Sequence, residues 1–261
     1  MAASVTGTAM ARGAVIRLAE SPEAMAEAAA SEVLAVLEAA MAWRGEAHVA
    51  LAGGRTPAAL YGALAMRPFD GWSHVHVWFG DERAVNPDHA DSNYRMAKDT
   101  LLSAVAIPDA HVHRWEGELA PATAAERYEA ALRTLAARQE RAAPTFDLLL
   151  LGMGADAHTA SLFPGSPLLE APAIEPGVVE AFAAAVHVPA MNSWRLTITP
   201  ATIRAARIAF VLVTGEDKHP ALRHVLGESR QLADAPASLL HQLQGDVAWY
   251  VDRAALFGTA P

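Results

Sequence analysis

An aspartate and a histidine that could do acid–base chemistry follow a run of four leucines near the middle of the chain. The leucines occupy residues 148–151, Gly152 and Gly154 come next, and Asp156 and His158 lie just beyond them. Histidine is the side chain best suited to act as a general base near neutral pH. The pattern predicts a buried strand, a glycine turn and a short helix that carries both groups at the carboxyl end of the strand, where ligands bind in open α/β sheets. Residues two apart in a turn need not touch, so the spacing leaves open whether His158 is a base or a histidine that caps a helix.

The same glycines match the dinucleotide-binding pattern G-x-G-x-x-G/A, an interpretation that we reject. That fold needs a long helix after the glycines, whereas the sequence PGSP at residues 164–167 ends any helix within about two turns. It also needs an acidic residue at the end of a following strand, and the proline-rich residues 168–177 predict no strand. The side chains of Asp156 and His158 would also crowd a pyrophosphate.

A second candidate site is the sequence AGGRTP at residues 52–57, between an expected strand and an expected helix. Gly53 and Gly54 would let the backbone approach a ligand closely. The free N–H groups at the start of a helix favour an anion, and Arg55 and the hydroxyl of Thr56 can add hydrogen bonds. The segment predicts a phosphate site, with an ordinary strand-to-helix turn capped by Thr56 as the alternative.

Charged residues of both signs follow another expected strand, in the sequence FGDER at residues 79–83. Asp81 or Glu82 could orient Arg83, whose guanidinium could then clamp a phosphate or a carbonyl oxygen. A solvated polar loop is the alternative for this segment.

Two cations lie beside later strand ends. Arg195 stands at the start of an expected strand, and Lys218 follows the end of another. Such residues are more often surface charges, but in a parallel sheet the ends of strands are where ligands bind. We therefore treat Arg195 and Lys218 as candidate phosphate-side cations.

Composition narrows the class of protein. The chain has 261 residues, 52% of them hydrophobic and 19% charged, which fits one α/β domain over residues 1–261. There is no cysteine, which excludes disulfides and thiolate chemistry, and the net charge of -9 argues against nucleic acid as a partner. No apolar run reaches the roughly 20 residues that span a bilayer, and the N-terminus lacks the apolar segment of a signal peptide. We expect a cytoplasmic protein with no obligate protein partner.

Other kinds of chemistry find less support in the sequence. His74 and His76 alternate along one expected strand, as do His111 and His113 along another, but no third metal ligand is evident. We therefore expect no metal site. The nucleophile motif G-x-S-x-G is absent, which argues against a covalent acyl-enzyme.

Strand and helix patterns alternate along most of the chain. Strands are expected at residues 14–18, 48–52, 75–79, 111–115, 147–151, 186–188, 195–199, 208–214 and 247–251. Helices are expected at residues 21–43, after 56, around 98, at 122–138, after 201 and at 217–226, and residues 80–93 are expected to form a polar loop. This alternation predicts an α/β fold with a mainly parallel sheet and helices on both faces.

Taken together, these segments resemble the signature sequences of the 6-phosphogluconolactonase family. AGGRTP, FGDERAV followed by DHADSNY, and LLGMGADAHTASLFPGS occur in the family's order, and RLTITP and VTGEDK are similar to its later phosphate-side segments. The resemblance covers nearly the whole chain. HTASLFPG is its most specific part, because it separates lactonases from the related glucosamine-6-phosphate deaminases. The resemblance implies the fold of the glucosamine-6-phosphate deaminase and ribose-5-phosphate isomerase group.

The resemblance also implies an activity and roles for the candidate residues. The activity is hydrolysis of a sugar-phosphate lactone, 6-phospho-D-glucono-1,5-lactone, in the oxidative pentose phosphate pathway, with no required cofactor. His158 would activate water and Asp156 would orient it, while Arg83, held by Asp81 or Glu82, would bind substrate or stabilise the oxyanion. The phosphate would be held by Gly53, Gly54, Arg55, Thr56, Arg195 and Lys218.

One departure from the family and two alternative functions stay open. The family usually has glycine where Ala157 separates Asp156 from His158, and an alanine with positive φ there would cost roughly 1 kcal/mol. An amino-sugar-phosphate deaminase or isomerase would use Asp81 as its proton-transfer base, but Arg83 departs from the deaminase motif. A non-catalytic sugar-phosphate sensor is the other alternative, although the N-terminal residues predict no helix-turn-helix.

Overall fold

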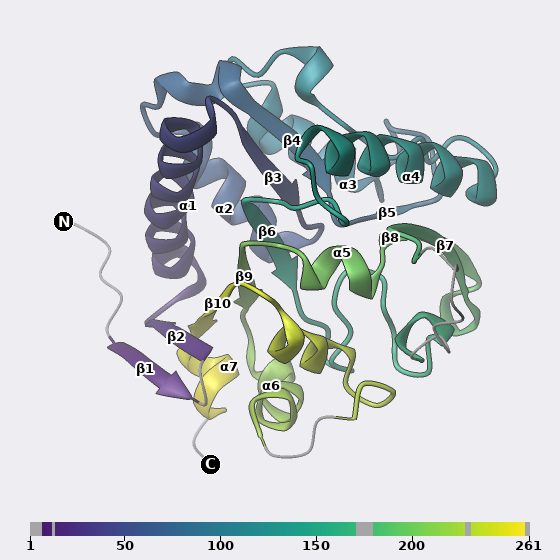
Figure 1. Ribbon diagram of the computed structural model, residues 1–261. Helices are drawn as coiled ribbons and strands as arrows, with labels where there is room; N and C mark the ends of the chain where they lie inside the picture. The colour runs from purple at the N-terminus through teal and green to yellow at the C-terminus, as the bar shows by residue number, and fades with distance from the viewer. Residues whose placement is uncertain (1–6, 12–13, 171–179, 228–230, 259–261) are drawn as a thin grey trace.

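The computed structural model describes residues 7–11, 14–170, 180–227 and 231–258. A seven-stranded sheet runs through it in the order β1-β2-β10-β9-β6-β3-β4 (Figure 1). All neighbours from β2 to β4 are parallel, and only β1 pairs antiparallel, so the predicted mainly parallel sheet is confirmed. Its strands are β1 (Gly7–Ala11), β2 (Ala14–Ala19), β3 (Ala47–Leu51), β4 (Val75–Phe79), β6 (Leu148–Gly152), β9 (Ile208–Val213) and β10 (Asp246–Asp252).

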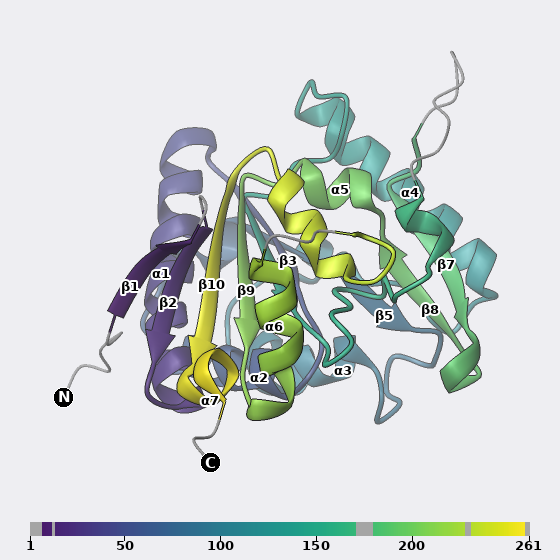
Figure 2. The ribbon, with the colours of Figure 1, turned by 90° about the horizontal axis from the view of Figure 1, so that it is seen from below.

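Helices cover both faces of this sheet, as Figures 1 and 2 show. Two long helices, α1 (Pro22–Arg44) and α2 (Arg55–Ala65), pack against each other and against central strands on one face. Local sequence sets the limits of α1: Ser21 caps it by accepting from the N–H of Ala24, and Gly45 ends it with φ of 79°. The other helices are α3 (Asn93–Ala97), α4 (Pro121–Arg138), α5 (Pro200–Arg204), α6 (His219–Leu226) and α7 (Arg253–Phe257).

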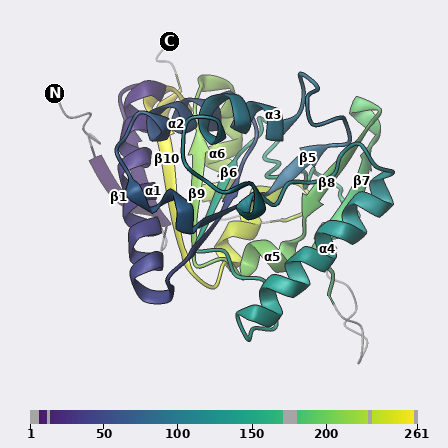
Figure 3. The ribbon, with the colours of Figure 1, turned by 90° about the horizontal axis from the view of Figure 1, so that it is seen from above.

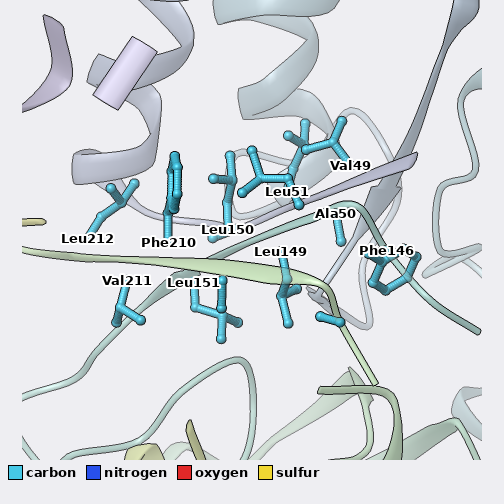
Figure 4. Close-up of a cluster of buried hydrophobic side chains, with 14 of the residues drawn as sticks. Val49, Ala50, Leu51, Phe146, Leu149, Leu150, Leu151, Phe210, Val211 and Leu212 are labelled. Atoms are coloured by element: carbon cyan, nitrogen blue, oxygen red, sulfur yellow. The ribbon is translucent and has the colours of Figure 1, made fainter. Parts of the chain in front are cut away.

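The central strands are apolar on both faces because both faces are covered. Side chains alternate along them: Leu150 and Phe210 point to one side of the sheet, and Leu149, Leu151 and Val211 point to the other (Figure 4). All five are at most 3% exposed. This burial fixes the register of the strands, and with it the positions at which each strand ends.

A second, antiparallel sheet lies beside the first. It contains β5 (Asp81–Arg83), β8 (Ser193–Ile198) and β7 (Ala183–Val188) in that order, and α4 packs along it (Figure 3). The sequence predicted β7 and β8 but placed residues 81–83 in a polar loop, which is wrong. Three charged residues carry no apolar alternation, so only the pairing with β8 makes this segment a strand.

Two other expectations differ from the structure, and a third falls largely outside the described residues. Residues 153–161 form turns and not the predicted short helix, because the loop closes on itself before a helical turn can form. Residues 111–115 do not form the predicted strand. His111 ends a 3-10 turn (Asp109–His111), and Val112 forms one isolated bridge with Val77. Most of the proline-rich stretch, residues 171–179, lies outside the described residues. No helix among the residues described is long and apolar enough to cross a membrane.

Candidate active site

A cavity of about 480 Å³ opens where the parallel strands end. Residues that directly follow β3, β4, β6 and β9 line it, as the topology of an open α/β sheet predicts. Its size falls in the range of small-molecule sites. Eight of the candidate residues line the cavity: Gly53, Gly54, Arg55, Thr56, Asp81, Arg83, His158 and Lys218. Three do not: Glu82, Asp156 and Arg195.

His158 and Asp156 form a hydrogen-bonded pair at the cavity wall. The distance from His158 Nδ1 to Asp156 Oδ1 is 2.5 Å, and the backbone N–H of His158 donates to the same oxygen at 3.2 Å. Burial acts to raise the pKa of Asp156, but the neighbouring imidazole and these hydrogen bonds lower it overall, so the carboxyl stays ionised. An ionised Asp156 keeps the ring proton on Nδ1, which leaves Nε2 free to accept a proton. The pairing that spacing alone left open is therefore present.

A tight loop sets this pair. The N–H of Ala157 donates to the carbonyl of Gly154 at 3.0 Å, and the N–H of Gly154 donates to the carbonyl of His158 at 2.9 Å. Ala157, the third residue between these two anchors, has φ of 63°, which is the left-handed conformation that such loops require. The family's glycine at this position thus has a physical reason, and this chain accepts a strained alanine instead. The loop also has no room for a side chain at Gly154, because a Cβ there would lie 2.1 Å from His158 Nδ1.

The glycine turn of residues 53–56 lines the cavity at the start of α2. Gly54, with φ of 106°, is the residue that caps α2, and the helix begins without a side-chain cap or an acidic residue in its first turn. The expectation that Thr56 caps the helix is wrong, since its hydroxyl instead shares a hydrogen bond of 2.7 Å with the hydroxyl of Thr214 after β9. Lys218, near the same strand end, pairs with Asp217 at 2.9 Å. The arrangement suits an anion.

Arg83 and Arg195 lie directly opposite each other on β5 and β8. Burial and the neighbouring positive charge of Arg83 lower the pKa of Arg195. Arg83 donates to the carbonyl of Asp91 at 2.5 Å, and in the described part of the chain no carboxylate forms an ion pair with it. The expectation that Asp81 or Glu82 orients the guanidinium of Arg83 is therefore wrong, and Glu82 contacts only the backbone N–H of that residue. The two guanidiniums instead form a pair of like charges that an anion would stabilise.

Glu82 is buried and serves the loop rather than the cavity. Its Oε1 accepts from the backbone N–H groups of Arg83 and Asn93 at 2.8 and 2.7 Å, and its Oε2 accepts from Ser92 Oγ and the N–H of Tyr94 at 3.0 and 2.9 Å. Burial raises the pKa of Glu82, and the backbone donors oppose that rise. The structure therefore does not support a substrate-binding role for Glu82, because its two oxygens accept from the N–H of Arg83 and from donors at the start of α3.

Asp81 does line the cavity, and two residues that the sequence did not single out hold it. Ser161 Oγ donates to Oδ2 at 2.6 Å, and Asn93 Nδ2 donates to Oδ1 at 3.1 Å. Both donors come from segments that carried the family resemblance, which was the only available signal. Their contact with Asp81 could not be inferred, because residues 81 and 161 are far apart in the sequence.

Four other histidines, His48, His76, His111 and His113, gather at the opposite edge of the sheet, where the strands begin. His76 stacks on His48 and His111, with ring centroids 4.7 and 3.9 Å apart, and Trp78 stacks on His113 at 3.9 Å. Across the described residues no group of three or more His, Asp or Glu is arranged to hold a metal ion. These rings thus pack against one another.

Comparison with known proteins fits the geometry. Residues 20–249 match the family model of glucosamine-6-phosphate isomerases/6-phosphogluconolactonase. The chain belongs to this family. A 6-phosphogluconolactonase of Synechocystis is 39% identical over 217 residues, which cover 83% of this chain and 86% of that protein.

Solved structures agree with this assignment. The 6-phosphogluconolactonase of Trypanosoma brucei superposes with a TM-score of 0.79 at 29% identity, over 92% of this chain and 96% of that one. A monomeric glucosamine-6-phosphate deaminase superposes with a TM-score of 0.72 at 21% identity, over 92% of this chain and 98% of that one. The deaminase likeness shows the fold alone, which is the fold that the sequence predicted.

Proposed function

We propose that this protein hydrolyses 6-phospho-D-glucono-1,5-lactone to 6-phospho-D-gluconate, the second step of the oxidative pentose phosphate pathway. The observation that carries the proposal is that His158, paired with Asp156 behind it, lines a cavity that Arg55, Arg83 and Lys218 also line. A base beside an anion-binding surface is what water attack on a phosphorylated lactone requires. Relatives named 6-phosphogluconolactonase, up to 39% identical in sequence, support the same substrate.

His158 acts as the general base in this proposal. With its Nδ1 proton held by Asp156, the free Nε2 takes a proton from water, and the water oxygen bonds to the lactone carbonyl carbon. The ring C–O bond then breaks, and the ring oxygen takes the proton from Nε2 to become a hydroxyl. General-base catalysis of this kind contributes about 10²–10⁴-fold to the rate. A lactone is an activated ester, so no bond to the protein is needed.

The cations divide between two walls of the cavity. The glycine turn with Arg55, Thr56 and Lys218 forms one anion-binding wall. Arg83, with Arg195 beside it, supplies positive charge at another. One wall binds the substrate phosphate and the other stabilises the carbonyl oxygen as it becomes negative, a contribution of about 3–4 kcal/mol for one such donor.

The proposal extends to the setting of the reaction. The substrate is a small sugar phosphate, and the reaction needs no cofactor, nucleic acid or membrane. We place it in the cytoplasm as part of the same proposal, because a phosphorylated lactone is made and consumed among other phosphorylated sugars.

A coupled assay tests the proposed function. The lactone is generated from glucose 6-phosphate with its dehydrogenase, and the product is detected with 6-phosphogluconate dehydrogenase. The wild-type protein should accelerate ring opening well beyond the spontaneous rate, and His158→Ala should lose most of kcat with little change in KM. His224→Ala, which removes an exposed histidine from α6, is the matched control and should keep full activity. Wild-type kcat in His158→Ala would exclude His158 as the base.

The alternative functions make different predictions in the same assay. A deaminase would release ammonia from glucosamine 6-phosphate, and a sensor would bind 6-phosphogluconate without accelerating hydrolysis. Neither is favoured, because the curated relatives that the chain matches across most of its length are lactonases.

A further inference from the structure

Two buried polar side chains from different loops fix the carboxylate of Asp81. Ser161 Oγ lies 2.6 Å from Oδ2, and Asn93 Nδ2 lies 3.1 Å from Oδ1. Ser161 is 1% exposed and Asn93 is 3% exposed, so water competes little for these bonds. Each carboxylate oxygen therefore has one donor from the protein, in a fixed direction.

The two donors are themselves held in place. Asn93 also donates to the carbonyl of Asp81 at 3.0 Å, and its backbone N–H donates to Glu82 at 2.7 Å. The N–H of Ser161 donates to Thr197 Oγ1 at 3.3 Å on β8. The orientation of Asp81 thus depends on contacts that are rigid and largely buried.

Asp81 also links the two functional parts of the cavity. The amide of Asn93 occupies the space that Gly53 leaves open, since a Cβ on Gly53 would lie 2.0 Å from Asn93 Oδ1. Ser161 follows His158 by three residues on the same loop. A single carboxylate therefore joins the glycine turn to the loop of the base.

The chemistry of a doubly held carboxylate suggests its use. An ionised carboxylate has about four acceptor positions, and the protein fills one on each oxygen, so acceptors remain toward the cavity that Asp81 lines. A sugar lactone presents ring hydroxyls, which donate. We propose that Ser161 and Asn93 are positioning residues that hold Asp81 as the acceptor for a hydroxyl of the sugar ring. This inference rests on the proposed function, because it takes the sugar-phosphate lactone as the ligand.

A double-mutant cycle tests the inference. KM and kcat are measured in the coupled assay for wild type, Ser161→Ala, Asp81→Ala and the double variant. Ser161→Ala should raise KM by roughly tenfold with a smaller effect on kcat, as expected when a bond to a charged group is lost. In the Asp81→Ala background, Ser161→Ala should have no further effect, because the residue through which it acts is gone. Asn93→Ala should behave in the same way, and its cycle decides the question if Ser161→Ala does not fold.

A control and the opposing outcomes complete the design. Ser238 is 1% exposed, and its hydroxyl has no hydrogen-bond partner among the described residues, so Ser238→Ala removes an equally buried serine hydroxyl without touching Asp81 and should leave KM unchanged. An unchanged KM in Ser161→Ala, or equal effects of that substitution with and without Asp81, would overturn the inference alone. Failure of the wild-type protein to accelerate hydrolysis would overturn the proposed function and the inference with it.

Discussion

Gly154→Ala should remove activity while leaving the fold intact. Gly154 does not have positive φ, so alanine brings no backbone strain at this position. Its Cβ would lie 2.1 Å from His158 Nδ1 and 2.4 Å from Asp156 Oδ1, well inside normal contact distance. Both contacts are with the ends of side chains, which can move apart by about 1 Å and break the hydrogen bond between them. A displacement of that size costs about 100-fold in kcat, while stability should change by less than about 1 kcal/mol.

The coupled lactone assay and thermal unfolding measure the two quantities separately. Gly152→Ala is the matched control. It adds the same methyl group two residues before Gly154, where the new Cβ would have no neighbouring atom within 4 Å. It should keep kcat, with at most a change in KM from the extra methyl group in the cavity. A folded Gly154→Ala protein with wild-type kcat would refute the dependence of catalysis on the pairing of His158 with Asp156. Equal losses in both variants would point to the strand end and not to the pair.

Two further predictions concern stability. Glu82→Gln should lower the free energy of unfolding by about 1–3 kcal/mol, because an amide NH₂ would face buried donors. Denaturation by urea measures this free energy, and an unchanged value would contradict the buried network around Glu82. Burial lowers the pKa of His76 and of His113 from 6.5 to about 4. The unfolded chain binds these protons near pH 6.5, whereas the folded chain binds them only near pH 4. The contribution of the two neutral histidines to the free energy of unfolding is therefore fully present above pH 6.5 and is lost as the pH falls toward 4. The loss should reach roughly 2 kcal/mol in total at pH 5 when partial exposure is allowed for, and a Tm that stays constant from pH 8 to pH 5 would contradict it.

The sequence predicted the main sheet well because its strands have strong local patterns. Val75–Phe79 and the leucine strand β6 are five-residue segments that are apolar at four positions each, the length and composition of a strand buried on both faces. Helix α1 was predicted within one residue at each end because Ser21, Pro22 and Gly45 are local signals that do not depend on the rest of the fold.

Features that depend on contacts between distant residues could not be predicted. The strand Asp81–Arg83 exists only through its pairing with β8, and the buried role of Glu82 follows from donors that lie 10 to 12 residues further on. A charged sequence such as DER is typical of a solvated loop, so burial was the opposite of the local indication. The sequence identified the correct segments of the site, but the partners within it came from tertiary structure.

The positions of His76, His113 and His158 explain why the last of these, and neither of the other two, is suited to catalysis. His76 and His113 are packed among other rings where the strands begin, and desolvation lowers their pKa to about 4, which keeps them neutral near pH 7. The His158 side chain is 30% exposed at the other end of the sheet, with a carboxylate on one ring nitrogen and the cavity beside the other. A base must exchange its proton in every cycle, so partial exposure and a fixed partner are both required. The loop that provides both turns at Ala157, and the strain at that residue is the cost of placing the base at the ligand edge of the sheet.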